Sequence, residues 1–191
     1  VTQHEGLAEI YAGSVNTLRM VTMLTTDDQA IVLATLMRCG MGTAFIDNWS
    51  AGGITVRVDL ESGGLGEAGY DKTGRKYVEH PDTGVVFASR TIPQWDRVTA
   101  FAKEIQSHFR YYRMLGLDIC VAPEGPVLIE INALPDLLMQ EQTCGPLLKD
   151  PRVFAEFERN DLIISRAQRR LHAPVGPEAV GSSSTSIQDS K

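Results

Sequence analysis

The sequence has few cysteines, no long apolar stretch and no excess of basic residues. Its three cysteines, Cys39, Cys120 and Cys144, are far apart and form no CxxC pair or Cys/His zinc spacing, so neither a disulfide scaffold nor a zinc site is expected. The 18 Lys and Arg against 24 Asp and Glu give a formal net charge of -6, which favours neither nucleic acid nor an anionic membrane as a partner. No apolar run approaches the ~18 residues of a membrane span, and no signal peptide is recognisable. We therefore expect a cytoplasmic protein with reduced, buried thiols.

The composition is that of a globular chain with a polar tail. Of the 191 residues, 43% are hydrophobic and 22% are charged, which is enough to bury a core. From Ala173 onward Pro, Gly and Ser predominate, so residues 173–191 are expected to be disordered. The first residue is Val1 rather than Met, and we expect a fragment whose upstream part is absent.

The first half of the chain favours β-structure. Residues 15–24 and 29–37 are apolar runs of strand length, joined by a Thr-Thr-Asp-Asp turn at 25–28, which predicts an antiparallel hairpin. Residues 54–60 alternate apolar and polar side chains, as a half-buried strand does. Residues 61–93 are rich in Gly, Asp, Thr and Pro and are expected to form an extended loop with short strands.

The second half combines helices with another hairpin. An apolar stripe at three- and four-residue steps predicts a helix over 95–113; its members are Val98, Phe101, Ala102, Ile105, Phe109 and Tyr112. Residues 117–122 and 127–131 predict a hairpin. Shorter and longer helices are expected over 135–142 and 151–172. The fold class is therefore α+β, an antiparallel sheet with packed helices.

The most informative segment is the second hairpin, DICVAPEGPVLIEIN. Glu130 and Asn132 are two residues apart, so they project from the same face of their strand. A turn at 123–126 brings Asp118 back beside them. The apolar run 127–129 favours a central strand, and isolated carboxylates there would be costly to bury. A hard cation such as Mg²⁺ would remove that cost, although these residues could equally lie at the solvated end of a hairpin.

The pattern of an Asp, then Glu-x-Asn on the adjacent strand, then Pro resembles the metal-binding end of the ATP-grasp superfamily. The ordered segments SVNTLRMVTM, MRCGMGTAFIDNWSAGGITVRVDLESG, HPDTG, IPQW and LGLDICVAPEGPVLIEINALPDLLMQ are similar to the sugar-transfer-associated ATP-grasp family. The resemblance implies a catalytic subdomain over 1–150, with a C-terminal helix over 151–172 packing on it. It also implies that the nucleotide-clamping N-terminal lobe of the same polypeptide precedes this chain, so that the chain alone would be inactive.

The resemblance also implies roles for individual residues. Asp118, Glu130 and Asn132 match the Mg²⁺ ligands that bridge the ATP phosphates. Arg19 and Arg38 match arginines that face the phosphates or an acyl phosphate. Guanidinium groups suit such anions because they are planar and permanently charged, but a lone strand-end Arg is more often a surface residue.

Three further positions match the loop near the γ-phosphate. Asn48, Gly52 and Gly53 form an N-x-x-x-G-G pattern, in which backbone N–H groups can approach an anion closely; an ordinary turn explains them equally well. His80, in HPDTG, could bind a substrate anion or act as an acid or base, or it could be structural.

The implied reaction uses ATP and Mg²⁺ to convert a carboxylate into an acyl phosphate, which an amine or another nucleophile then attacks. The family association suggests a small-molecule or sugar-linked carboxylate substrate in surface-polysaccharide biosynthesis. The alternative is a non-catalytic nucleotide- or partner-binding module that keeps the fold.

Overall fold

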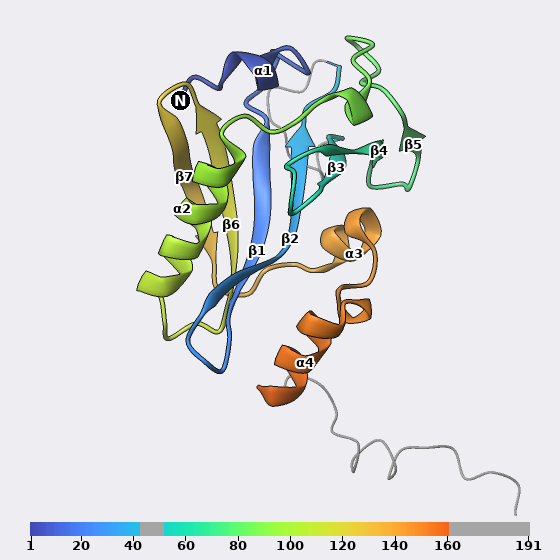
Figure 1. The fold of residues 1–191 in the computed structure, drawn as a ribbon. Helices are drawn as coiled ribbons and strands as arrows, with labels where there is room; N and C mark the ends of the chain where they lie inside the picture. Colours follow the sequence, from blue (N-terminus) through green and yellow to red (C-terminus); the bar gives the residue numbers. More distant parts are fainter. Residues whose placement is uncertain (43–51, 161–191) are drawn as a thin grey trace, which may run out of the picture.

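The computed structural model describes residues 1–42 and 52–160 (Figure 1). Within them the strands form one seven-stranded antiparallel sheet in the order β5-β4-β3-β2-β1-β6-β7. The strands are β1 (Thr17–Leu24), β2 (Ala30–Cys39), β3 (Ile54–Val58), β4 (Leu65–Tyr70), β5 (Lys76–Tyr77), β6 (Met114–Ala122) and β7 (Gly125–Asn132). The α+β class predicted from the sequence is confirmed.

Strand β1 is central, and all eight of its residues are buried. It pairs with β2 on one side, as the predicted hairpin requires, and with β6 on the other. The two hairpins are therefore joined through β1, although β2 ends at Cys39 and β6 begins only at Met114. This arrangement places residues from both hairpins on neighbouring strands.

One face of the sheet packs against α1 (Glu5–Ala8), α2 (Trp95–His108) and the short 3-10 helix η2 (Phe87–Ser89). Leu18 and Met20 of β1 belong to this core, as do Val98 and Ala102 of α2. In Figure 1, α2 lies in front of the strands β6 and β7. The part of the predicted apolar stripe from Val98 to Ile105 therefore packs on the sheet.

The opposite face is covered only in part. Helices α3 (Leu138–Cys144) and α4 (Pro151–Arg159), with the turn η3 (Leu147–Lys149) between them, pack against the β1–β2 hairpin. The second core cluster consists of Val21, Met23, Leu33, Ala34, Leu147, Val153 and Phe157. Helix α4 begins with Asp150 as its N-cap and Pro151 in its first turn, a favourable start for a helix.

Three helix boundaries differ from the predictions. Helix α4 ends at Arg159, with Asn160 as its C-cap, and residues 161–172 of the predicted helix lie outside the described residues. Helix α2 ends at His108, and Phe109 and Tyr112 are 43% and 41% exposed. The chain turns there because the buried Gln106 side chain donates to the carbonyl of Tyr112 and thereby closes a turn. Helix α3 begins at Leu138 rather than at Pro135.

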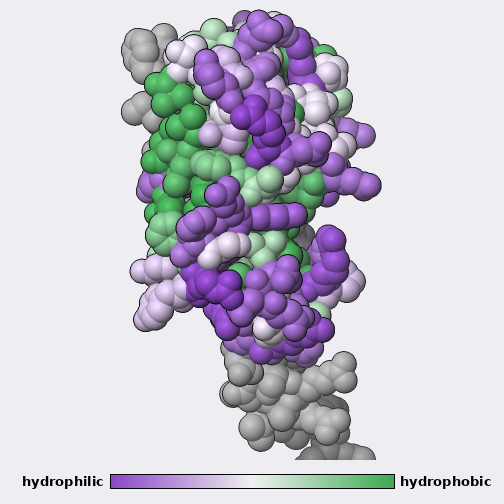
Figure 2. Space-filling view, turned by 60° about the vertical axis from the view of Figure 1, so that its left-hand side comes forward, coloured by the Kyte–Doolittle hydropathy of each residue, from purple (hydrophilic) through white to green (hydrophobic). Residues whose placement is uncertain are grey.

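The prediction that the second strand of the hairpin is central was wrong. Within the described residues β7 is an edge strand, and Val127 and Ile129 are 36% and 50% exposed. Figure 2, which brings the β7 side forward, shows a hydrophobic surface there. Leu128 and Ile131 pack against the core shared with α2, so only one face of this apolar strand is covered.

Candidate functional site

A row of charged side chains crosses three strands. Arg19 on β1 lies directly opposite Asp118 on β6, and Asp118 lies opposite Glu130 on β7. Directly opposed side chains in antiparallel strands share a face of the sheet. Because the alternate residues Leu18 and Met20 pack on the α2 side, this row lies on the other face.

Asp118 is bound by two arginines. Arg19 forms a two-pronged pair with it: Nε donates to Oδ1, and Nη2 donates to Oδ2 at 3.0 Å. Arg38 Nη2 donates to the same Oδ2, also at 3.0 Å. Asp118 is only 3% exposed, and the two arginine side chains are 11% and 12% exposed. Charge-assisted hydrogen bonds in a site with so little access to water are strong and geometrically selective.

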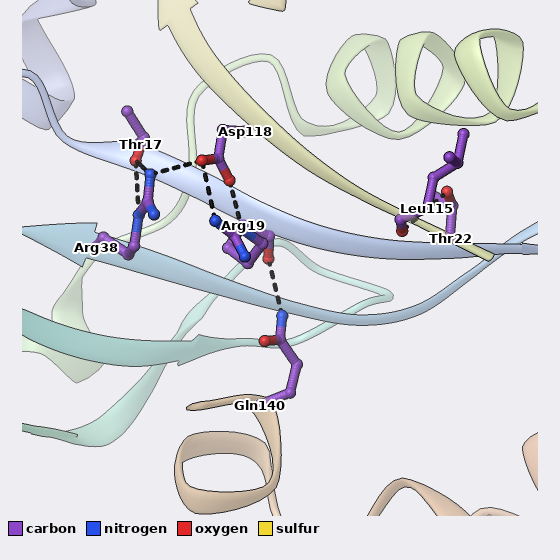
Figure 3. A network of polar contacts seen from close by, with 7 residues as sticks. All are labelled: Thr17, Arg19, Thr22, Arg38, Leu115, Asp118 and Gln140. Carbon is purple, nitrogen blue, oxygen red and sulfur yellow. Dashed lines mark hydrogen bonds and ion pairs between the residues drawn. The ribbon is translucent and has the colours of Figure 1, made fainter. Parts of the chain in front are cut away.

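Two polar residues that the sequence analysis did not single out complete this network (Figure 3). Thr17 Oγ1 accepts from Nε and Nη2 of Arg38, at 3.0 and 2.8 Å. Gln140 of α3 is fully buried, and its amide donates to the carbonyl of Arg19 at 3.4 Å. The register Thr17↔Arg38 explains the first contact, but a local sequence pattern gives no signal for either residue.

A β-bulge brings Glu130 onto this face. The β6–β7 register shifts between Asp118, which pairs with Glu130, and Ile119, which pairs with Leu128. Ile129 is therefore the extra residue. Bulges re-aim side chains in this way and are frequent beside functional sites. Without the bulge, alternation could not direct Leu128 and Ile131 to the core and Glu130 to the opposite face.

Asn132 follows two residues later and pairs with Gly116. A Cβ built on Gly116 would lie 2.8 Å from Cβ of Pro135 and 3.6 Å from Cβ of Asn132, so only glycine leaves the space that Pro135 fills. The amide nitrogen of Asn132 is buried and has no hydrogen-bond partner within the described part of the chain. Buried amides normally have partners, so this side chain has bonding capacity to spare.

The chemistry of this set suits Mg²⁺. Asp118, Glu130 and Asn132 all carry oxygen donors, and Mg²⁺ typically takes one or two carboxylates and shares the rest of its shell with water and phosphate. Two carboxylates are fewer than the three-residue His, Cys, Asp or Glu cluster typical of a protein-only metal cage, and residues 1–42 and 52–160 contain no such cluster. The donors therefore fit a metal that is held jointly with a phosphate-bearing substrate.

His80 lies in a separate polar cluster. Its ring is fully buried, with Nε2 2.8 Å from the carbonyl of Gly40 and Nδ1 accepting from the backbone N–H of Asp82 at 3.3 Å. It stacks on Tyr11 with ring centroids 4.8 Å apart. Both ring nitrogens face backbone groups, an arrangement that favours the structural alternative for His80 over the acid–base role.

Of the loop predicted to contact the γ-phosphate, Asn48 lies outside the described residues. Gly52 has a positive φ of 103°, and no atom of the described residues lies within 4 Å of a Cβ built on it. Gly53 is buried and leads directly into β3. The positive φ at Gly52 suits glycine, and the role of this glycine pair toward phosphate stays a prediction.

The cavities found in the described part of the chain lie away from the charged row. Four of them have volumes between about 460 and 620 Å³, and none is lined by Arg19, Arg38, Asp118 or Glu130. The arginines fill the space above Asp118 with their own side chains. The charged row is therefore a chemically specific, largely buried cluster on one face of the sheet, and none of these four cavities opens onto it.

Comparison with known protein families matches residues 1–150 to the sugar-transfer associated ATP-grasp family. The chain belongs to this family. A search among curated proteins found no significant match. Among the residues that the structure describes, no helix has the length and apolar character needed to cross a membrane.

Proposed function

We propose that this ATP-grasp chain carries the metal- and phosphate-binding side of a ligase that activates a carboxylate with ATP and Mg²⁺. The single observation that supports this most strongly is the convergence of Arg19, Arg38 and Asp118 on one sheet face, in register with Glu130. Family membership over residues 1–150 gives the nucleotide class, and the charged row gives the chemistry.

In this proposal the residues act by positioning and by charge. Arg19 and Arg38 hold phosphate or acyl-phosphate oxygens through their planar forks. Asp118, Glu130 and Asn132 hold the metal. The bound metal neutralises the negative charge that develops on the phosphates. Phosphoryl transfer requires little else from a protein, because positioning and electrostatic stabilisation supply most of the catalysis.

The proposed reaction has two steps. A carboxylate oxygen of the substrate attacks the γ-phosphorus of ATP, the bond to the β–γ bridging oxygen breaks, and ADP leaves with the electron pair. An amine nitrogen, or another nucleophile, then attacks the acyl carbon; the bond to the phosphoryl oxygen breaks, inorganic phosphate leaves, and the nucleophile loses a proton. The family description suggests a small-molecule or sugar-linked carboxylate substrate.

A second candidate is a non-catalytic nucleotide- or partner-binding module. One observation favours it: Asp118 already has ion-pair partners on both oxygens, and a purely structural ion-pair cluster would need no metal. Such a protein would bind nucleotide without releasing ADP.

The test is Mg²⁺-dependent ADP release by the full-length polypeptide, with carboxylate and amine pools as substrates. Glu130→Gln is expected to lower turnover by at least about 10- to 100-fold, the loss usual for groups that support a metal. Glu124→Gln is the matched control, because Glu124 is exposed in the turn of the same hairpin. Nucleotide binding without ADP release in any substrate pool would favour the non-catalytic module, and equal turnover in both variants would contradict the role of Glu130.

A further inference from the structure

Asp118 occupies two roles that compete for the same oxygens. It is the proposed metal ligand, and it is also the acceptor of guanidinium hydrogen bonds from Arg19 and Arg38 on both of its oxygens. At 3% exposure it has little access to water in place of these partners. A metal ion cannot coordinate an oxygen of Asp118 while both guanidinium groups keep all of their hydrogen bonds to this carboxylate.

We propose that Arg38 is an exchangeable arm that couples metal binding to anion binding at this site. In this mechanism an anionic phosphate draws Arg38 away from Asp118 and thereby frees a carboxylate oxygen for the metal. The inference rests on the proposed function and adds to it an order of events: the metal binds weakly until phosphate oxygens engage the arginine.

The contact geometry indicates which arginine moves. Arg19 holds Asp118 with Nε and Nη2 together, a two-pronged pair, and Gln140 holds the backbone of Arg19 from α3. Arg38 reaches Asp118 through Nη2 at 3.0 Å, and its Nε and Nη2 also donate to Thr17. Its guanidinium therefore contacts Thr17 as well as Asp118, and shifting it toward an anion leaves the Arg19–Asp118 pair intact.

The charges around Asp118 also favour metal binding only after an anion has engaged Arg38. Asp118 is buried between two guanidinium groups, whereas Glu130 is exposed, so positive charge predominates around the oxygens of Asp118 and repels a divalent metal at short range. An anion on Arg38 cancels that repulsion. Coupling of this kind is reciprocal, so the metal must tighten anion binding by the same factor. Coupling between sites is typically about 5- to 150-fold.

The test measures metal binding alone, without turnover. The free Mn²⁺ signal in electron paramagnetic resonance reports Mn²⁺ binding by the full-length protein in phosphate-free buffer. Arg38→Gln is expected to bind Mn²⁺ at least about 5-fold more tightly than wild type, the lower end of such coupling, although it removes a proposed phosphate ligand. Arg38→Lys, which keeps the charge but loses the planar fork, is expected to fall between them and serves if Arg38→Gln does not fold.

Arg57→Gln is the matched control. Arg57 lies on β3, exposed, directly opposite Leu36, which is in turn opposite Arg19. The substitution Arg57→Gln therefore removes one positive charge from the same face of the sheet and leaves the contacts of Asp118 unchanged. We expect the Mn²⁺ affinity of Arg57→Gln to stay within about 2-fold of wild type, because Arg57 is exposed and solvent screens its charge.

The possible outcomes separate the two proposals. Unchanged or weaker Mn²⁺ binding in Arg38→Gln, no measurable binding by either protein at millimolar Mn²⁺, or an equal gain in Arg57→Gln would overturn the coupling. The proposed function is tested separately by Mn²⁺ binding in the presence of a non-hydrolysable ATP analogue. With the analogue present, wild type is expected to bind Mn²⁺ more tightly than Asp118→Asn. If this difference is found, the proposed function stands, and a failed Arg38→Gln result then refutes the coupling alone.

Discussion

Replacing Asp118 by Asn is the most direct probe of the charged row, because it removes the charge and leaves the volume almost unchanged. The guanidinium groups of Arg19 and Arg38 would then lose the carboxylate that both of them contact, in a site where their side chains are only 11% and 12% exposed. Removing one partner from a buried ion pair typically costs about 3–5 kcal/mol, because an uncompensated buried charge remains. We expect a loss of this size in the free energy of unfolding.

The assay is thermal unfolding followed by far-ultraviolet circular dichroism. For a chain of this length a loss of about 1 kcal/mol lowers Tm by roughly 2–4 °C, so the expected shift is roughly 6–20 °C. Asp28→Asn is the matched control. Asp28 pairs with Arg110, but their side chains are 58% and 53% exposed, and its φ of 61° is one that Asn tolerates well. Exposed pairs contribute about 0–1 kcal/mol.

Added phosphate gives a second measurement. If the arginines bind anions, phosphate should stabilise Asp118→Asn more than wild type, because ligand binding to the folded state raises its stability. A loss below about 1 kcal/mol, the range of exposed pairs, or one equal to that of Asp28→Asn, would refute the view that Asp118 holds two buried cations.

Other predictions concern packing and ionisation away from the site. Gly69→Ala should cost about 1–3 kcal/mol, since its Cβ would lie 2.5 Å from Ile54 Cγ2, whereas Gly66→Ala on the same strand meets its nearest atoms at 3.5 Å and should be nearly neutral by urea unfolding. Burial raises the pKa of Cys144 to about 11; because the folded pKa lies above the unfolded one, this contribution to stability is complete below about pH 9 and is lost as the pH rises toward 11. Cys144→Ala should therefore lose less stability than wild type between those pH values, and equal losses would contradict the assignment. The buried carboxylate of Glu156 accepts a hydrogen bond from the backbone N–H of Thr26 at 3.1 Å. Glu156→Ala leaves that N–H without this partner and should cost about 1–3 kcal/mol; a neutral result in thermal unfolding would contradict this stabilising role.

Local sequence patterns predicted the local elements well. The apolar runs at 15–24 and 29–37 gave the β1–β2 hairpin, and the stripe after residue 95 gave α2. These patterns succeed because side-chain periodicity and turn residues act over a few positions. They failed at the C-terminal end of α2, where a tertiary contact of Gln106 with Thr22 and Tyr112 sets the boundary.

The site was predicted in part. The spacing of Glu130 and Asn132, with a turn near residue 124, correctly placed Asp118 opposite Glu130. The apolar run beside Glu130 gave the wrong position for its strand, because a strand with one covered face and one exposed face can be apolar on both. The metal-binding role of these residues stays a prediction.

By itself the sequence determined the class of fold, the two hairpins and the family, because these depend on patterns carried within short segments. Only the tertiary structure decided that Arg19 meets Asp118 across 99 positions and that Arg38 meets it across 80. The order of the strands sets these two contacts with Asp118, and the bulge at Ile129 sets the position of Glu130 beside it. Both follow from how the whole sheet buries its apolar faces against α2 and α4, and no local pattern carries that information.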